Sequence, residues 1–74
     1  MSASAQTRAA ALDFARWDEI ARLSELATSY WTSVALAADR GDALTVVVHC
    51  KQVLAVTREA FTLVKQLGQE EPSR

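Results

Sequence analysis

The chain contains two long segments in which apolar residues recur at spacings of three and four, and a short break separates them. The first segment covers about residues 7–39, lacks glycine and proline, and is rich in alanine and other residues that favour helix. The second segment covers about residues 43–67 and keeps the same spacing. Such spacing places apolar side chains on one face of an α-helix, so the pattern predicts two amphipathic helices.

Each predicted helix has a main apolar face that we expect to be buried. On the first helix, the apolar face is interrupted near its N-terminal end by Arg16 at its centre and Asp13 at its edge. We therefore expect residues 7–18 either to pack on the core or to form an arm that captures a partner. The face of the first helix comprises Ile20, Leu23, Ala27, Tyr30, Val34 and Ala37, and that of the second comprises Val46, Cys50, Val53, Thr57, Ala60, Phe61 and Val64.

The break between the two segments, residues 40–42, has the residues of a tight turn. Gly41 can adopt the left-handed conformation that ends a helix, and Asp42 can accept hydrogen bonds from the free N–H groups that open the next one. The sequence therefore predicts an all-α fold, a two-helix antiparallel hairpin. One alternative concerns Thr45–Val48, where β-branched residues favour a strand. We prefer the helix because the helical spacing continues well past the length of an ordinary strand, about 3–10 residues.

The predicted domain is a single hairpin over residues 7–68, with a flexible N-terminus at 1–6 and a flexible polar tail at 69–74. Gly68 is the expected terminator of the second helix. Because the first helix is predicted to be longer than the second, the end that carries Phe14 and Trp17 is expected to have little of its own hairpin to pack on. This overhang is a candidate site for a partner.

Both helices carry more apolar residues than one mutual interface needs. This surplus either completes the hairpin itself, or pairs two hairpins into a dimeric four-helix bundle or clamps a partner's helix. The second set of the second helix comprises Val56, Leu63 and Leu67, and that of the first comprises Trp17, Ala21, Ser24, Thr28, Trp31, Ala35 and Ala38. The residues expected at a protein interface are Phe14, Trp17, Tyr30, Trp31, Val56 and Leu63, because aromatic and large apolar anchors dominate binding energy.

The composition favours association in another way. A chain of 74 residues seldom buries enough apolar surface to fold without a disulfide, a metal or a partner. With one cysteine and one histidine it has too few residues for an intrachain disulfide or a structural zinc site, and we expect no metal and no cofactor. No apolar run is long enough for a membrane span, and the N-terminus does not resemble a secretory signal. Because a lone thiol is typical of a reducing compartment, we expect a cytoplasmic protein that does not bind membranes.

Catalytic residues are not expected. His49 is the one side chain whose ordinary pKa is near neutrality, and its place at the edge of the apolar face indicates a structural or interface role. Cys50 lies in the main apolar face and points about 100° away from His49, which is poor geometry for a nucleophile and its base. The chain also has no phosphate-binding glycine loop and no paired metal-ligand motif. We therefore expect a protein that is not an enzyme.

A basic row, formed by Lys51, Arg58 and Lys65, recurs every seven residues along one side of the second helix. Such a row could contact successive phosphates, although the formal net charge of −1 gives no general attraction to nucleic acid. The leading interpretation is a small protein-interaction module, acting as an adaptor, chaperone, assembly factor or inhibitor through self-association or docking on a larger protein. The alternative is a nucleic-acid-binding regulator of the dimeric helical-hairpin type that uses the basic row.

Overall fold

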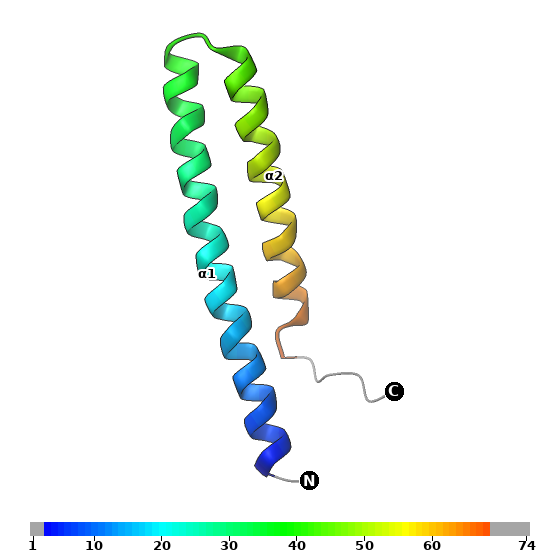
Figure 1. Cartoon of the computed structure of the whole chain (residues 1–74). Coiled ribbons are helices and arrows are strands. Elements are labelled where there is room, and N and C mark those ends of the chain that lie inside the picture. Colours follow the sequence, from blue (N-terminus) through cyan, green and yellow to red (C-terminus); the bar gives the residue numbers. More distant parts are fainter. Residues whose placement is uncertain (1–2, 69–74) are drawn as a thin grey trace.

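The computed structural model describes the backbone of residues 3–68 and the side chains of residues 7–68. It contains two α-helices, α1 (Ala3–Asp39) and α2 (Ala43–Gln66), which pack side by side in opposite directions (Figure 1). The predicted antiparallel hairpin is confirmed. The strand interpretation of Thr45–Val48 is wrong, since these residues form the first turns of α2. The predicted tail at 69–74 and residues 1–2 lie outside the described residues.

The N-terminus of α1 differs from the prediction. The helix begins at Ala3, so it includes residues 3–6, which the sequence placed before the first helix. These residues include alanines, and a helix already formed further along the chain extends easily through residues of high helix propensity. α2 ends at Gln66, one residue before the predicted end.

The turn between the helices satisfies the backbone at both helix ends. Gly41 has φ 69°, and its N–H donates to the carbonyl of Ala38 while the N–H of Asp42 donates to that of Ala37. This is the pairing of a Schellman motif, which glycine favours because it lacks a Cβ. Asp42 then caps α2, as predicted: its Oδ1 accepts from the backbone N–H of Thr45 at 3.1 Å and its Oδ2 from the Thr45 hydroxyl at 2.7 Å.

The two helices meet along a seam whose residues follow a seven-residue repeat. Its buried members are Leu23 and Ala37 of α1 and Val53 and Val56 of α2. The seam consists of Arg16, Glu19, Leu23, Leu26, Tyr30, Ser33 and Ala37 on α1, and of Val46, His49, Val53, Val56, Ala60, Leu63 and Leu67 on α2. The predicted apolar face of α1 is buried or half-buried as expected, because Ile20, Ala27 and Val34 lie directly beside this seam.

The predicted face of α2 is wrong in its C-terminal half. Thr57, Phe61 and Val64 are exposed, while Val56, Leu63 and Leu67 turn toward α1. The prediction assumed 100° per residue, whereas two helices that pack along their whole length follow about 3.5 residues per turn. The two repeats diverge by about 20° per heptad, so over the three heptads from Val46 to Leu67 the expected face drifts by about 60° from the observed one.

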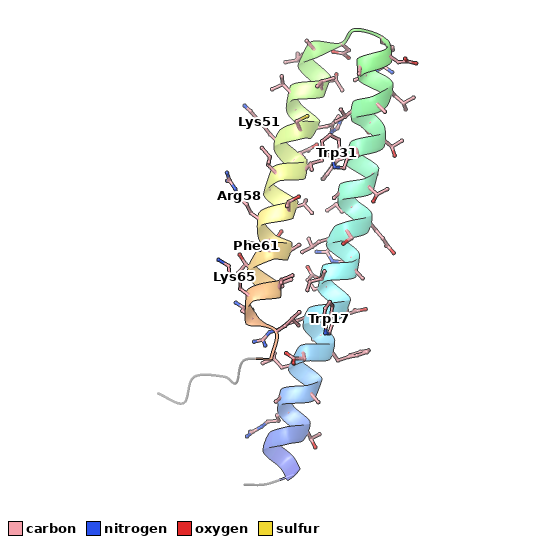
Figure 2. All side chains as sticks on the ribbon, turned by 180° about the vertical axis from the view of Figure 1, so that it is seen from behind. Trp17, Trp31, Lys51, Arg58, Phe61 and Lys65 are labelled. Atoms are coloured by element: carbon pink, nitrogen blue, oxygen red, sulfur yellow. The ribbon has the colours of Figure 1, made fainter. Side chains whose placement is uncertain are left out.

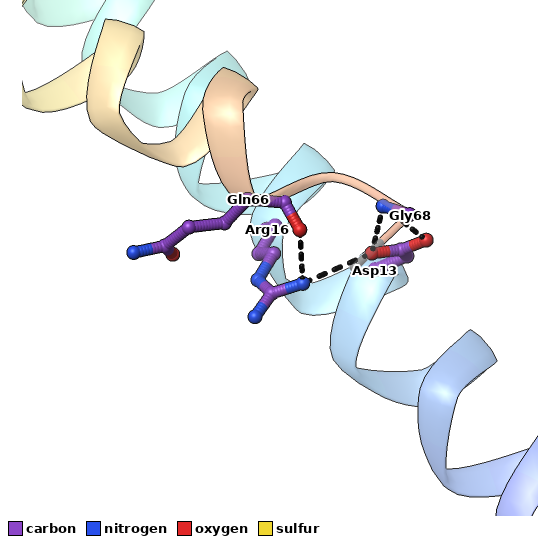
Figure 3. Close-up of polar contacts among 4 residues, drawn as sticks. All are labelled: Asp13, Arg16, Gln66 and Gly68. Atoms are coloured by element: carbon purple, nitrogen blue, oxygen red, sulfur yellow. Dashed lines mark hydrogen bonds and ion pairs between the residues drawn. The ribbon is translucent and has the colours of Figure 1, made fainter. Parts of the chain in front are cut away.

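A polar clamp closes the seam at the end opposite the turn (Figure 3). Arg16 donates to the backbone carbonyl of Gln66 at 2.6 Å and to Asp13 at 3.2 Å, and the Asp13 carboxylate accepts from the backbone N–H of Gly68 at 3.1 Å. Gly68 has φ 77°, the conformation expected of a helix terminator. The two residues that interrupt the apolar face of α1 thus bind the free backbone groups at the end of α2.

The clamp also sets where the overhang begins. The chain that follows α2 reaches Asp13, so Phe14 and Trp17 lie between the clamp and the turn, where their side chains are 74% and 59% exposed. The part of α1 that continues past the clamp is residues 3–12 (Figure 1). Both helices therefore share a paired region that runs from the clamp to the turn.

Candidate protein-interaction surface

One side of the hairpin carries most of its large exposed apolar residues. On α1, Trp17 and Trp31 are 59% and 53% exposed, and on α2, Leu54 and Phe61 are 57% and 59% exposed. Each of these residues directly follows a seam residue in the sequence. Because the helices run in opposite directions, one step of about 100° past the seam rotates both helices toward the same side of the hairpin.

We call this surface the apolar face. On each helix its residues again follow alternating spacings of three and four, which makes it a second, uncovered seam. The apolar face comprises Phe14, Trp17, Ala21, Ser24, Thr28, Trp31, Ala35 and Ala38 on α1, and Ala43, Val47, Cys50, Leu54, Thr57, Phe61 and Val64 on α2. Most of its α1 residues between the tryptophans are small, so another helix can approach the backbone closely there.

The opposite side of the hairpin is more polar. Arg22 pairs with Glu19 one turn before it on α1. The pKa of Arg22 is raised chiefly by the hydrogen bonds and the charge of Glu19, and to a smaller extent by the charge of Glu59 on α2. Arg22 and Glu59 each directly precede a seam residue, so they share one side of the hairpin. Trp17, Trp31 and Phe61 directly follow seam residues and lie on the other side. The hairpin thus has one apolar and one charged side.

The basic row borders the apolar face. Lys51, Arg58 and Lys65 are exposed and project from the side of α2 that points away from α1 (Figure 2). Each follows a large residue of the apolar face by one helical turn, and the Lys65 ammonium lies 5.1 Å from the centre of the Phe61 ring. A cation at that distance from an aromatic ring is attracted by the π face of the ring. The row is therefore continuous with the apolar face along its outer edge.

The structure separates the predicted interface residues into two groups. Phe14, Trp17 and Trp31 are exposed on the apolar face, so they are available to a partner. The other three belong to the seam and are covered by the hairpin itself: Val56 is only 7% exposed, and Leu63 and Tyr30 are half-buried. Val56 and Leu63 thus pack within the hairpin, because the face of α2 that meets α1 is rotated from the one expected at 100° per residue.

Sequence reasoning placed Phe61 and Val64 in the buried face of α2, and it left Val47 and Leu54 out of every apolar set. They are exposed on α2 and complete a row with Phe61 at seven-residue spacing. The signal was present in the sequence, since Ala43, Val47, Cys50, Leu54, Thr57, Phe61 and Val64 keep alternating spacings of four and three. It was hidden because α2 has two such rows, and spacing alone does not say which one faces α1.

The His49 side chain contacts residues of both helices. The ring of His49 stacks on that of Tyr30 across the seam, with centroids 5.8 Å apart, and its Nδ1 lies 2.6 Å from the Oε1 of Gln52. Cys50 is a half-buried free thiol at the edge of the apolar face. In the part of the chain whose side chains are described, no three histidine, cysteine or acidic residues are grouped so as to hold a metal ion.

Comparison with known proteins does not indicate a function for the apolar face. The chain matches no protein-family model, no curated protein and no solved structure. Within residues 3–68, neither helix has a stretch that is long and apolar enough to cross a membrane.

Proposed function

We propose that this protein is a small helical protein-interaction module, without catalytic activity of its own, which acts through its apolar face by self-association or by docking on a larger protein. The observation that carries the proposal is the uncovered second seam. It spans both helices and carries Trp17, Trp31, Leu54 and Phe61, each more than half exposed. Contiguous exposed apolar surface of this kind marks a site of protein association, because leaving it in water is unfavourable.

The shape of the apolar face suits a helical partner. Two antiparallel helices present a pair of ridges with a shallow line of small or half-buried residues between them, including Ala27 and Val34. A helix that packs against such a surface can interdigitate its own side chains at the usual three and four spacing. Such a surface is compatible with the role of an adaptor, a chaperone, an assembly factor or an inhibitor. These roles differ in which partner is bound and not in how the surface contacts it.

Substitution of Trp31 by alanine tests this function. Sedimentation equilibrium at micromolar concentration and retention of protein partners on the immobilised chain give the dissociation constants. Since a buried tryptophan is a typical hot spot, Trp31→Ala is expected to weaken association by roughly 30-fold or more, about 2 kcal/mol. Leu36→Ala is the matched control, because Leu36 is 57% exposed on the same helix but outside the apolar face.

A folded monomer that retains no protein would overturn the proposal. If association persists and Trp31→Ala leaves the dissociation constant unchanged, Trp31 is not an interface anchor and the contact lies elsewhere. Equal losses in Trp31→Ala and Leu36→Ala would indicate a general loss of folding.

A second candidate function, binding of nucleic acid, is favoured by one observation, the exposed basic row on the outer side of α2 (Figure 2). In this case affinity for RNA or DNA should fall steeply with salt, and Lys51→Glu with Arg58→Glu should abolish it. A gel-shift titration at about 50 mM salt, which favours phosphate contacts, decides the question. No binding under that condition removes this candidate.

A further inference from the structure

The apolar face has borders of opposite charge on its two long edges. On α2 the border is the basic row, Lys51, Arg58 and Lys65. On α1 the residues that directly follow face residues Trp17 and Ser24 are acidic, Asp18 and Glu25, and Asp39 continues the same line toward the turn. All three carboxylates of this acidic column are exposed. Any partner that covers the apolar face therefore meets positive charge along one edge and negative charge beyond the other.

The packing of the helices fixes the heights of these charges along the hairpin. Tyr30 lies level with His49, and Arg16 lies level with the end of α2 at Gln66. Relative to these contacts, Lys65, Arg58 and Lys51 lie at about the same heights along the hairpin as Arg16, Leu23 and Ser29, respectively. Asp18 and Glu25 fall in the two gaps between those levels. The acidic column and the basic row are thus staggered, so the two would interleave if they were brought together.

A second copy of the chain can cover the apolar face in two symmetric ways. With the two-fold axis parallel to the helices, α1 of each copy packs on α2 of the other, and both turns lie at the same end. With the axis perpendicular to the helices, α1 packs on α1 and α2 on α2, and the turns lie at opposite ends. Both are closed, self-complementary dimers.

Charge separates the two arrangements. The perpendicular axis brings the basic rows of both copies to one shared edge, where like charges repel. With the parallel axis, the basic row of each copy lies along α1 of the other copy. The acidic column of that α1 lies just beyond the edge where the two helices meet. Because a parallel axis preserves height, the staggered order of Lys65, Asp18, Arg58, Glu25 and Lys51 is kept across the interface.

Side-chain size points the same way. On α1 the tryptophans are separated by Ala21, Ser24 and Thr28, which leave a gap for a large side chain. By the same count of levels, Leu54 lies opposite this gap when height is preserved. Alternation of large and small residues across facing helices is the packing of a four-helix bundle.

We therefore propose that the apolar face binds a second copy of this chain through a two-fold axis parallel to the helices, so that α1 packs against the partner's α2. The inference rests on the proposed function, because it names the occupant of the same surface. It places both turns at one end of a four-helix bundle. The overhangs, residues 3–12 of each copy, then emerge together at the other end.

Distance measurement between two spin labels tests the arrangement. A nitroxide on Arg40→Cys, in a Cys50→Ala background, reports the separation of the two turns in the dimer by pulsed dipolar spectroscopy. The parallel axis predicts about 20–30 Å, roughly two helix diameters. The perpendicular axis places the turns at least the length of α2 apart, which for its 24 residues is about 36 Å.

The outcomes separate this inference from the function on which it rests. A short distance supports the parallel axis. A long distance in a chain that sediments as a dimer overturns the arrangement but leaves self-association in place. A chain that stays monomeric at micromolar concentration overturns the inference, and if it also binds no other protein the proposed function fails with it.

Charge reversal gives a second measurement that needs no label. Lys51→Glu, Arg58→Glu and Lys65→Glu together should weaken the homodimer about tenfold at low salt, since each exposed pair contributes modestly. Mixing this variant with Asp18→Lys and Glu25→Lys chains should restore dimerisation, as mixed dimers. The perpendicular axis predicts instead that the row-reversed variant dimerises as well as the original and pairs best with the unmodified chain, and that result would overturn the proposal.

Discussion

The seam and the apolar face are built from the same kind of sequence, yet only one of them is covered within the chain. Both follow spacings of three and four on both helices, and both mix large residues with alanine and serine. The seam excludes water from Leu23 and Val53, whereas the apolar face leaves Trp17 and Leu54 more than half exposed. Two helices can cover only one side of each other, so the apolar face is surface that a further helix pair would bury.

The difference also shows what holds the hairpin together at its ends. The seam is bounded by specific polar contacts, the turn at Gly41 and Asp42 and the clamp at Asp13 and Arg16. The apolar face has charges only along its outer edges. The seam is thus fixed in register by this chain alone, while the register on the apolar face depends on what binds it.

The largest expected effect is on the seam. Leu23 is 1% exposed, and Leu23→Ala should lower the free energy of unfolding by about 2–5 kcal/mol, because it removes buried methyl groups and leaves a cavity. Urea unfolding measures the free energy of unfolding, and its decrease should be seen at both of two protein concentrations. Leu36→Ala, the same substitution at an exposed site of α1, should change stability by less than about 0.5 kcal/mol. Equal losses would mean that Leu23 is not in the core.

The apolar face should respond in association rather than in intrinsic folding. Leu54→Glu places a charge at the centre of the face and is expected to weaken association by roughly 100-fold, about 2.7 kcal/mol. Sedimentation equilibrium measures this, with circular dichroism at high concentration to check helix content. Ala55→Glu is the control, since this exposed neighbour lies on the other side of α2. If both variants associate like the unmodified chain, the face is not the contact surface.

The clamp tests where the seam ends. Arg16→Met keeps an apolar stem but removes the donor to the Gln66 carbonyl, so the last turn of α2 should fray at a cost of about 1–2 kcal/mol. Hydrogen exchange of the amides at Leu63–Leu67 should accelerate roughly tenfold, while amides near the turn stay protected. Arg22→Met should leave all of them unchanged, because the Arg22–Glu19 pair is exposed. Uniform acceleration along α2 would show that Arg16 supports the whole seam.

Much of the fold could be read from the sequence because its signals are local. Gly41 and Asp42 specify the turn by backbone chemistry alone, and the absence of glycine and proline from α1 specifies a long helix. The role of Arg16 could not be read, since its partner across the seam, the Gln66 carbonyl, lies 50 positions away in the sequence. Nor could the sequence say whether Val56 or Phe61 faces α1. The two apolar rows on α2 differ by a small rotation about the helix axis, and the packing of the two helices determines which row is buried.

The same limit applies to the candidate surface. Trp17 and Trp31 stood out because they are large and lie outside the predicted buried face of α1. Leu54 did not stand out, since one more leucine in a helix rich in apolar residues carries no signal by itself. Its place on the apolar face follows from the direction of the seam on α2, which depends on every contact with α1.

The smallest predicted effect concerns the turn end of the seam. The pKa of Asp42 is held below its usual value, first by the hydrogen bond from the Thr45 hydroxyl and then by that from the Thr45 backbone N–H. A carboxylate with a lowered pKa stabilises the folded chain fully above its unfolded pKa, about 4, and the contribution is lost as the pH falls through the lower folded pKa. Asp42→Asn keeps a capping oxygen but has no carboxylate to protonate, so it should remove the part of the acid-induced loss of stability that comes from Asp42.

A titration of the Asp42 side chain by carbon-13 NMR is sharper than a melting curve, because the pKa of Glu19 is also lowered by its hydrogen bond to Arg22 and its titration contributes to the same acid range. Thr45→Val removes the hydroxyl, the largest cause of the shift, so the pKa of Asp42 should rise toward its usual value while the backbone cap remains. Thr57→Val, the same substitution at an exposed site of α2, should leave it unchanged. An unaltered Asp42 pKa in Thr45→Val would mean that the hydroxyl contact at the turn does not persist in solution, so that the backbone alone caps this end of the seam.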